Sequence, residues 1–203
     1  MGDHGYPGPA LDEPNDTPRL LTPRLEISFG RPEDVDALFP YVHGEAGRAV
    51  TDTLLWDGPD DPQDILTFLR DHPATTFESG GYNWVIRDRD GSLSGAAGRA
   101  IGAIGIRPGG QVGEADIGYW IAPPFWNRGL MTEAVAALVR HAFDHWGFTL
   151  VAADAFTVNV ASQRLLEKIG FELVGEHPGY VIKRGTPVDG FRYEIRPGRL
   201  RDR

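Results

Sequence analysis

The segment with the clearest potential for chemistry runs from Glu114 to Ala134, where the sequence reads EADIGYWIAPPFWNRGLMTEA. A strand pattern leads into a loop marked by two prolines, and Gly129 then opens a long helix pattern. A helix N-terminus offers unpaired backbone N–H groups and the positive end of the helix dipole, so it attracts anions. Gly129 lets a diphosphate approach the backbone closely, and Arg128 adds charge beside it. The segment therefore predicts a phosphate site, with an ordinary glycine turn as the alternative.

A second segment, Asn159 to Phe171 (NVASQRLLEKIGF), places polar residues where a buried strand pattern ends. Asn159 or Ser162 could cap the helix that follows. The apolar positions Leu165, Leu166 and Ile169 are typical of the buried face of that helix. Core packing explains the apolar residues but not an Asn and a Ser together at this place, so both are candidates for a site.

Several other chemistries lack the residues they need. The chain has no cysteine, which excludes disulfides, thiolate metal sites and a cysteine-bound intermediate. The Walker pattern and a complete G-x-G-x-x-G before a helix are both absent. No G-x-S-x-G elbow supports Ser162 as a hydrolase nucleophile. His141 and His145 have the spacing of metal ligands on a helix, but no third ligand accompanies them, so we predict no metal site.

The elements that position these segments alternate between strand and helix patterns. Strands are predicted over residues 20–29, 82–87, 100–106, 114–121, 150–156, 171–174 and 191–195. Helices are predicted after Arg31-Pro32-Glu33-Asp34, through Ile65, Leu66 and Leu69 to His72-Pro73, over 129–146, and over 161–169. A loop is expected at residues 177–180. This order describes one α/β domain with a mixed sheet.

The composition limits the class of protein and its partners. The 203 residues suit one domain, with 41% hydrophobic and 24% charged residues. A net charge of −9 argues against nucleic acid and anionic membranes as partners. We expect a disordered tail at 1–18, a folded domain at 19–197 and a frayed C-terminal tail at 198–203. No signal peptide or apolar run of about 18 residues is present, so we predict a cytoplasmic protein.

Together the motifs resemble the GNAT superfamily of N-acetyltransferases, and within it the RimJ/RimL-like branch. The phrases that carry the resemblance are Asp116 to Ile121, Trp126 to Ala134, Asn159 to Phe171, the opening Leu21-Thr22-Pro23-Arg24-Leu25, and Asp189 before the last strand. The similarity spans roughly residues 20–195. It implies the GNAT fold, an α/β fold with a mixed, mostly antiparallel sheet, a splayed central strand pair and about four flanking helices.

The resemblance also implies acetyl-CoA as co-substrate, with no metal. In the family, a loop of the pattern Gln/Arg-x-x-Gly-x-Gly/Ala binds the CoA pyrophosphate through backbone amides. Here Trp126 replaces the Gln or Arg and Met131 replaces the small residue, changes that leave the backbone amides in place. The pantetheine arm would meet the backbone near Ile121 on one side, and Asn159 and Ser162 on the other. The implied cofactor contacts are Ile121, Ala122, Trp126, Asn127, Arg128, Gly129, Leu130, Met131, Thr132, Asn159 and Ser162.

Acetyl transfer to an amine needs a proton acceptor, because an alkyl ammonium has a pKa of about 10. Asp116 is the first candidate and Glu114 the second, since residues two apart on a strand share a face. Simple solvation of both carboxylates is the alternative. Many family members protonate the departing thiolate with a Tyr at the position that Leu166 occupies here. We expect Ser162 to take that role as a hydrogen-bond donor.

The loop between the first two helices commonly walls the acceptor pocket in this fold. Here it carries Trp56 and five aspartates without any Lys or Arg: Asp52, Asp57, Asp60, Asp61 and Asp64. This pattern suits a cationic acceptor, with a solvated acidic loop as the alternative. Trp56 and Asp52 are candidates for substrate contact. Trp84 is a third, although it is also typical of a core residue.

The sequence thus predicts an N-acetyltransferase that moves acetyl from acetyl-CoA to a primary amine in a ternary complex. The family favours the α-amine at a protein N-terminus as acceptor. The alternatives are a small cationic amine, such as a polyamine, an aminoglycoside or another antibiotic, and a non-catalytic acyl-CoA sensor. Branch membership suggests a homodimer.

Overall fold

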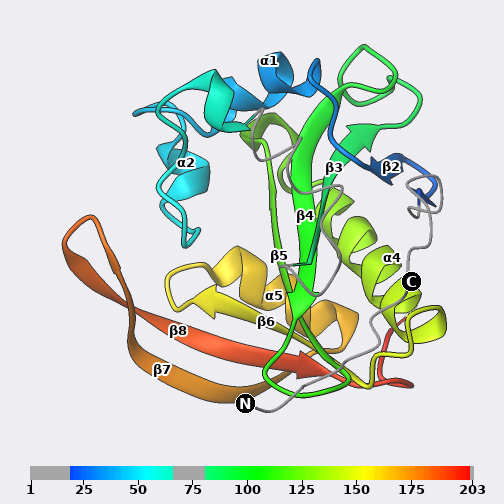
Figure 1. The fold of residues 1–203 in the computed structure, drawn as a ribbon, viewed down its shortest axis with the longest axis vertical. Helices are drawn as coiled ribbons and strands as arrows, with labels where there is room; N and C mark the ends of the chain where they lie inside the picture. The colour runs from blue at the N-terminus through cyan, green and yellow to red at the C-terminus, as the bar shows by residue number, and fades with distance from the viewer. Residues whose placement is uncertain (1–18, 66–80, 202–203) are drawn as a thin grey trace, which may run out of the picture.

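The computed structural model describes residues 19–65 and 81–201 and has a single mixed sheet at its centre (Figure 1). The predicted tail at 1–18 and the predicted helical residues Leu66 and Leu69 lie outside the described residues. The strands are β1 Leu20–Leu21, β2 Leu25–Ser28, β3 Tyr82–Asp88, β4 Ala100–Pro108, β5 Glu114–Ile121, β6 Leu150–Phe156, β7 Glu172–Lys183 and β8 Thr186–Ile195. Their order in the sheet is β1-β2-β3-β4-β5-β6-β8-β7.

Helices cover both faces of this sheet. The α-helices in the described ranges are α1 Asp34–Leu38, α2 Arg48–Thr51, α4 Leu130–Asp144 and α5 Val160–Ile169, with 3-10 turns η1 Phe39–Tyr41 and η3 Pro123–Phe125. The main core lies between the sheet and α4 and α5, and a smaller one lies under α1 and α2. Strand alternation divides β3 between them, because Trp84 and Ile86 enter the main core and Val85 the smaller one.

The central strands β5 and β6 pair only at their beginnings. Glu114 to Asp116 lie beside Leu150 to Ala152 in parallel register, and beyond these residues β5 and β6 do not pair with each other. All other neighbouring strands are antiparallel. The predicted splayed strand pair is therefore present, and it opens the sheet next to the start of α4.

Glycines end and begin the two long helices as predicted. Gly129, at the N-cap of α4, has φ 71°, and Gly170, at the C-cap of α5, has φ 115°. A Cβ on Gly170 would lie 2.3 Å from the backbone oxygen of Arg199, so only glycine fits there. Residues after 197 are packed as well, since the N–H of Arg201 donates to Ile169 O at 2.8 Å.

The last two strands are longer than the sequence pattern predicts. β7 continues through the expected loop at 177–180, with an irregularity between His177 and Val181. The turn to β8 is made by Arg184 and Gly185, at φ 48° and 80°, values typical of a two-residue hairpin. The hairpin curves along one edge of the molecule and its tip approaches α2 (Figure 1).

Candidate active site

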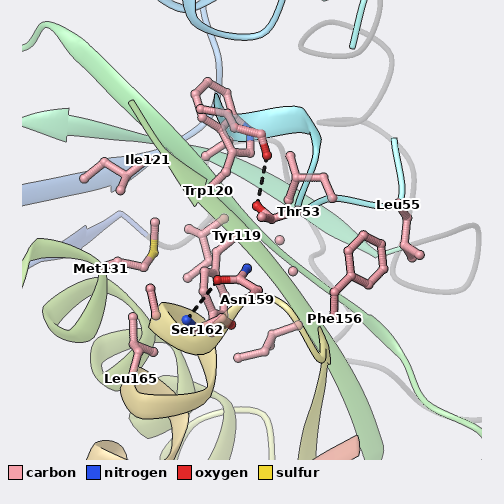
Figure 2. Close-up of a pocket in the computed structure, with 18 of the residues that line it drawn as sticks. Thr53, Leu55, Tyr119, Trp120, Ile121, Met131, Phe156, Asn159, Ser162 and Leu165 are labelled. Carbon is pink, nitrogen blue, oxygen red and sulfur yellow. Dashed lines mark hydrogen bonds between the residues drawn. The ribbon is translucent and has the colours of Figure 1, made fainter. Parts of the chain in front are cut away.

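A cleft of about 1160 Å³ occupies the gap between β5 and β6. Its walls come from β5, the start of α4, the start of α5, and the segment that follows α2 (Figure 2). Most of the predicted cofactor residues line it: Ile121, Trp126, Asn127, Gly129, Leu130, Met131, Thr132, Asn159 and Ser162. Elements far apart in sequence thus meet at the splay.

The backbone of β5 turns polar groups toward this gap. Ile121 lies opposite Gly102, and the N–H of Ala122 donates to Ile101 O at 2.8 Å, which makes Ile121 and Gly102 a non-hydrogen-bonded pair. By alternation, the N–H and C=O groups of Tyr119 and Ile121 point away from β4, toward the side that β6 has left. An extended ligand can pair with these groups as a strand would.

At this strand end, most backbone groups of Ile121 and Ala122 already have partners. Ala122 is fully buried, its N–H is donated to Ile101, and its C=O accepts from Phe125 N–H at 2.9 Å, so neither group is free for a cofactor. Ile121 O is also taken, because the Trp126 indole Nε1 donates to it at 2.7 Å. The Trp at the Gln/Arg position therefore braces the strand end, and the N–H of Ile121 is the group left to bind.

The loop before α4 has the form of an anion site. Asn127 and Gly129 have φ of 60° and 71°, and the first helical bond runs from Glu133 N–H to Gly129 O. The backbone N–H groups of residues 127–132 precede the helical ladder, and no acceptor for them is recorded within residues 19–65 and 81–201. Arg128 lies outside the cleft lining, with its guanidinium 5.9 Å from the Phe125 ring centre.

Across the cleft, three polar side chains gather at the start of α5. Asn159 caps the helix, since its Oδ1 accepts from Ser162 N–H at 3.1 Å (Figure 2). The Ser162 hydroxyl shares a hydrogen bond of 2.9 Å with the hydroxyl of Tyr119 on β5. Burial raises the pKa of Tyr119 well above its ordinary value, against the opposing effect of the Ser162 bond. The phenol is therefore neutral and able to donate.

On the opposite face of β5, the predicted base Asp116 is part of an ionic network. Arg192 on β8 donates to Asp116 Oδ1 at 2.6 Å and to Asp154 Oδ2 at 3.2 Å. Tyr180 also donates to Asp154 Oδ2, at 2.9 Å, and Asp154 Oδ1 is buried without a recorded partner. Asp116 lines the cleft, whereas Glu114 does not, because it lies where β5 and β6 are still paired.

The β7–β8 hairpin pairs with two of the five aspartates of the predicted acidic acceptor wall. Arg184 pairs with Asp52, and Lys183 pairs with Asp57 at 2.6 Å and donates to Trp56 O at 2.7 Å. Asp52 lies outside the cleft lining. The groups from this segment that do line the cleft are mostly apolar: Val50, Leu54, Leu55, Trp56 and Ile65, with Thr53 and Asp64.

Trp84, the third candidate for substrate contact, is a core residue instead. It is 1% exposed and lies outside the cleft lining. Its ring stacks on Trp146 with centroids 5.8 Å apart and packs near Tyr82 at 5.5 Å. Strand alternation turns it toward α4, away from the acceptor side.

Comparison with known proteins identifies the family. Residues 24–172 match the acetyltransferase (GNAT) domain. The chain is also 30% identical over 179 residues to an uncharacterized N-acetyltransferase, YoaA, of Bacillus subtilis (strain 168), covering 88% of this chain and 96% of the relative. The chain belongs to the GNAT acetyltransferases.

Solved GNAT structures share the fold of this acetyltransferase. RimL, a ribosomal L7/L12 alpha-N-protein acetyltransferase solved with coenzyme A, aligns with a TM-score of 0.73 at 17% identity, covering 86% of this chain and 95% of RimL. The microcin C7 self-immunity acetyltransferase MccE, solved with acetyl-CoA and AMP, aligns with a TM-score of 0.74 at 16% identity, covering 89% of this chain and 97% of that chain.

Sequence reasoning missed Tyr119, which lines the cleft of this acetyltransferase, and Arg192, which pairs with the cleft residue Asp116. Tyr119 sits inside the quoted motif DIGYWI, and its alternation with Asp116 and Trp120 places it on the α5 side, a signal that was available. The sequence pattern did not indicate Arg192, because Arg192 and its partner Asp116 are 76 residues apart in the chain. Tyr119 thus places a phenol in the cleft from a strand, whereas the helical position that the resemblance gives to a Tyr holds Leu166.

Proposed function

We propose that this acetyltransferase transfers acetyl from acetyl-CoA directly to a primary amine, and that the favoured acceptor is the N-terminal α-amine of a peptide or protein. The observation that carries the proposal is the open splay, where the free backbone groups of β5 lead to the unpaired N–H groups before α4. The backbone groups of β5 match the amides of the pantetheine arm, and the N–H groups before α4 match the diphosphate of CoA. RimL and MccE, which share this fold, were solved with CoA and acetyl-CoA, and this supports acetyl-CoA as the co-substrate.

The reaction requires positioning and two proton transfers. The amine gives a proton to Asp116 or to water, and its nitrogen then attacks the thioester carbonyl carbon. The C–S bond breaks while the departing thiolate accepts a hydrogen bond from the Ser162 hydroxyl, which is itself hydrogen-bonded to the Tyr119 hydroxyl at 2.9 Å. The excess proton of the nitrogen then passes through water to the sulfur, so that the products are the amide and neutral CoA thiol. Because the chain has no cysteine, the acetyl group cannot form a thioester intermediate with the protein.

Pairing of two acceptor-wall aspartates with the β7–β8 hairpin favours a peptide over a polycation as acceptor. Lys183 and Arg184 occupy Asp57 and Asp52, two of the five acids that would otherwise attract a polyamine or aminoglycoside. Asp64 accepts the N–H groups of Asp60 and Asp61, so its charge serves the loop itself. The cleft lining is mostly apolar, and its three acids, Asp64, Asp116 and Asp154, already accept hydrogen bonds from other groups of the protein, which suits one amine attached to an apolar side chain.

A non-catalytic acyl-CoA sensor is the second candidate, and the ion pair of Asp116 with Arg192 favours it. Paired in this way, Asp116 is less available as a base. The shared hydrogen bond of Tyr119 and Ser162 favours the enzyme, because a sensor needs no proton donor at the thioester.

An acceptor panel tests the proposal. Release of CoA is followed with short peptides bearing free or acetylated N-termini, with spermidine, and with an aminoglycoside. We expect turnover with free peptide N-termini, and loss of that turnover with retained CoA affinity in Asp116→Asn and Ser162→Ala. Turnover only with the polycations would overturn the acceptor assignment, and CoA binding without any turnover would favour the sensor.

A further inference from the structure

The opening motif Thr22-Pro23-Arg24 is far in sequence from the cleft but contacts the helix that begins it. Glu133, in the first turn of α4, accepts three hydrogen bonds from this motif and forms an ion pair with it. Its Oε1 accepts from Thr22 Oγ1 at 2.5 Å and from Arg24 N–H at 3.0 Å. Its Oε2 accepts from Arg24 Nε at 2.7 Å and lies 2.7 Å from Arg24 Nη2 in an ion pair. Arg24 and Glu133 therefore form a two-pronged clamp, a geometry that only arginine offers.

The Arg24 side chain of this clamp also contacts the loop ahead of α4. The remaining nitrogen of the guanidinium, Nη1, donates to the backbone oxygen of Arg128 at 2.9 Å. The peptide bond between Arg128 and Gly129 is trans, because no described peptide bond is cis. In a planar trans peptide the C=O and N–H groups point in opposite directions. Holding Arg128 O therefore turns the N–H of Gly129 away from Arg24, and Gly129 lines the cleft.

Arg24 also brings positive charge close to the loop without entering the cleft. A Cβ built on Gly129 would lie 3.8 Å from Arg24 Nη2, so the guanidinium borders the glycine. The Arg24 side chain is 40% exposed and that of Glu133 is 16% exposed. Burial acts to raise the pKa of Glu133, but the bonds from Thr22 and Arg24 outweigh it and leave that pKa below its ordinary value. The carboxylate thus stays charged and keeps hold of Arg24.

We infer that Arg24 is a positioning residue for the diphosphate of CoA, holding the Arg128–Gly129 peptide so that its N–H faces the phosphates. This inference rests on the proposed use of acetyl-CoA. It gives the opening motif a role in cofactor affinity, exerted through the loop, while the reacting thioester lies at the far end of the pantetheine arm. Replacing Arg24 should then weaken the binding of ligands that carry a diphosphate and leave the binding of ligands that lack it unchanged.

The test compares Arg24→Met and Arg24→Lys with the matched control Arg19→Met. Arg19 belongs to the same N-terminal segment and forms its own ion pair, with Glu26 at 2.5 Å, but touches no part of the loop. Calorimetric titration with CoA should give about tenfold weaker binding for Arg24→Met, the size of one lost charged hydrogen bond. Arg24→Lys should recover only part of this affinity, because one ammonium cannot hold Glu133 and Arg128 O together. Arg19→Met should bind as the wild type does.

A second comparison separates the clamp from general damage to the fold. Rates are measured with acetyl-CoA and with S-acetylpantetheine, which lacks the diphosphate, using the best acceptor from the panel. Arg24→Met should raise KM for acetyl-CoA with little change in kcat, and leave kcat/KM for S-acetylpantetheine unchanged. Equal losses with both donors, or unchanged CoA binding, would overturn the clamp. A wild-type protein that binds no CoA would instead refute the proposed function.

Discussion

Replacing Tyr119 with Phe removes one oxygen atom from the cleft and should slow catalysis without weakening cofactor binding. The Tyr119 hydroxyl lies 2.9 Å from Ser162 Oγ and has no other recorded partner among the described residues. In the proposed reaction, charge develops on the CoA sulfur, Ser162 donates a hydrogen bond toward it, and the Tyr119 hydroxyl is hydrogen-bonded to Ser162. The variant keeps Ser162 but leaves its hydroxyl without this support.

The size of the effect follows from the kind of hydrogen bond lost. In the ground state the bond joins two neutral groups and is worth about 1 kcal/mol. When the sulfur carries charge, a donor to it is worth about 1.5–3 kcal/mol, and each 1.36 kcal/mol is about tenfold in rate. The loss in kcat follows the difference between these two values, about 0.5–2 kcal/mol, so we expect kcat to fall by about 2- to 30-fold and KM for acetyl-CoA to stay within about twofold.

The assay follows free CoA with a thiol reagent, which reports only the product because the protein has no cysteine. Tyr193→Phe is the matched control, since Tyr193 is a buried tyrosine that lies outside the cleft lining and donates weakly to Glu167 at 3.4 Å. Because burial raises the pKa of Tyr119, ionisation of this residue should cause no loss of wild-type rate below pH 10. A Tyr119→Phe protein with full kcat would refute the role of this hydroxyl.

Three further predictions concern the frame around the cleft. The pKa of Tyr180 is raised to about 12 by burial and by the charge of Asp154. Because the folded state favours the neutral phenol, the protein loses stability as the pH rises from about 10 to about 12. Tyr180→Phe should therefore show a smaller fall in thermal midpoint over that pH range than the wild type. Arg184→Ser should raise KM for the acceptor several-fold without changing KM for acetyl-CoA in steady-state kinetics, because the hairpin loses a contact with the acceptor wall. Asp34→Ala leaves Arg87 buried without its counter-charge, and urea unfolding should show a loss of about 3–5 kcal/mol.

The sequence predicted the elements that depend on local pattern. The strand at 114–121, Gly129 at the start of α4, Gly170 at the end of α5, and the polar start of α5 at Asn159 are all present in the structure. These features rest on backbone geometry within a few residues, which composition and spacing record directly. The GNAT fold with its splay then followed from the order of the motifs.

Features made by distant partners could not be predicted in this way. The acids after α2 suggested a cationic pocket, but Arg184 reaches Asp52 from 132 positions away. Pro178 and Gly179 suggested a loop, yet pairing with β8 extends β7 through them. In both cases tertiary contacts outweigh the local preference of the chain.

The carboxylates of β5 show where alternation alone falls short. Glu114 and Asp116 share a face, as predicted, but only Asp116 is far enough along the strand to line the cleft. The point at which β5 and β6 part decides between them, and that point is a property of the folded sheet.

Calorimetric titration of the purified protein with acetyl-CoA tests the central claim most directly, because every step above requires the cofactor to enter the splay. The account predicts micromolar binding of acetyl-CoA, with similar affinity for desulfo-CoA, since the diphosphate and pantetheine groups supply the contacts. No binding of either ligand would contradict the assignment of this cleft as a CoA site, and with it the proposed transfer of acetyl to an amine.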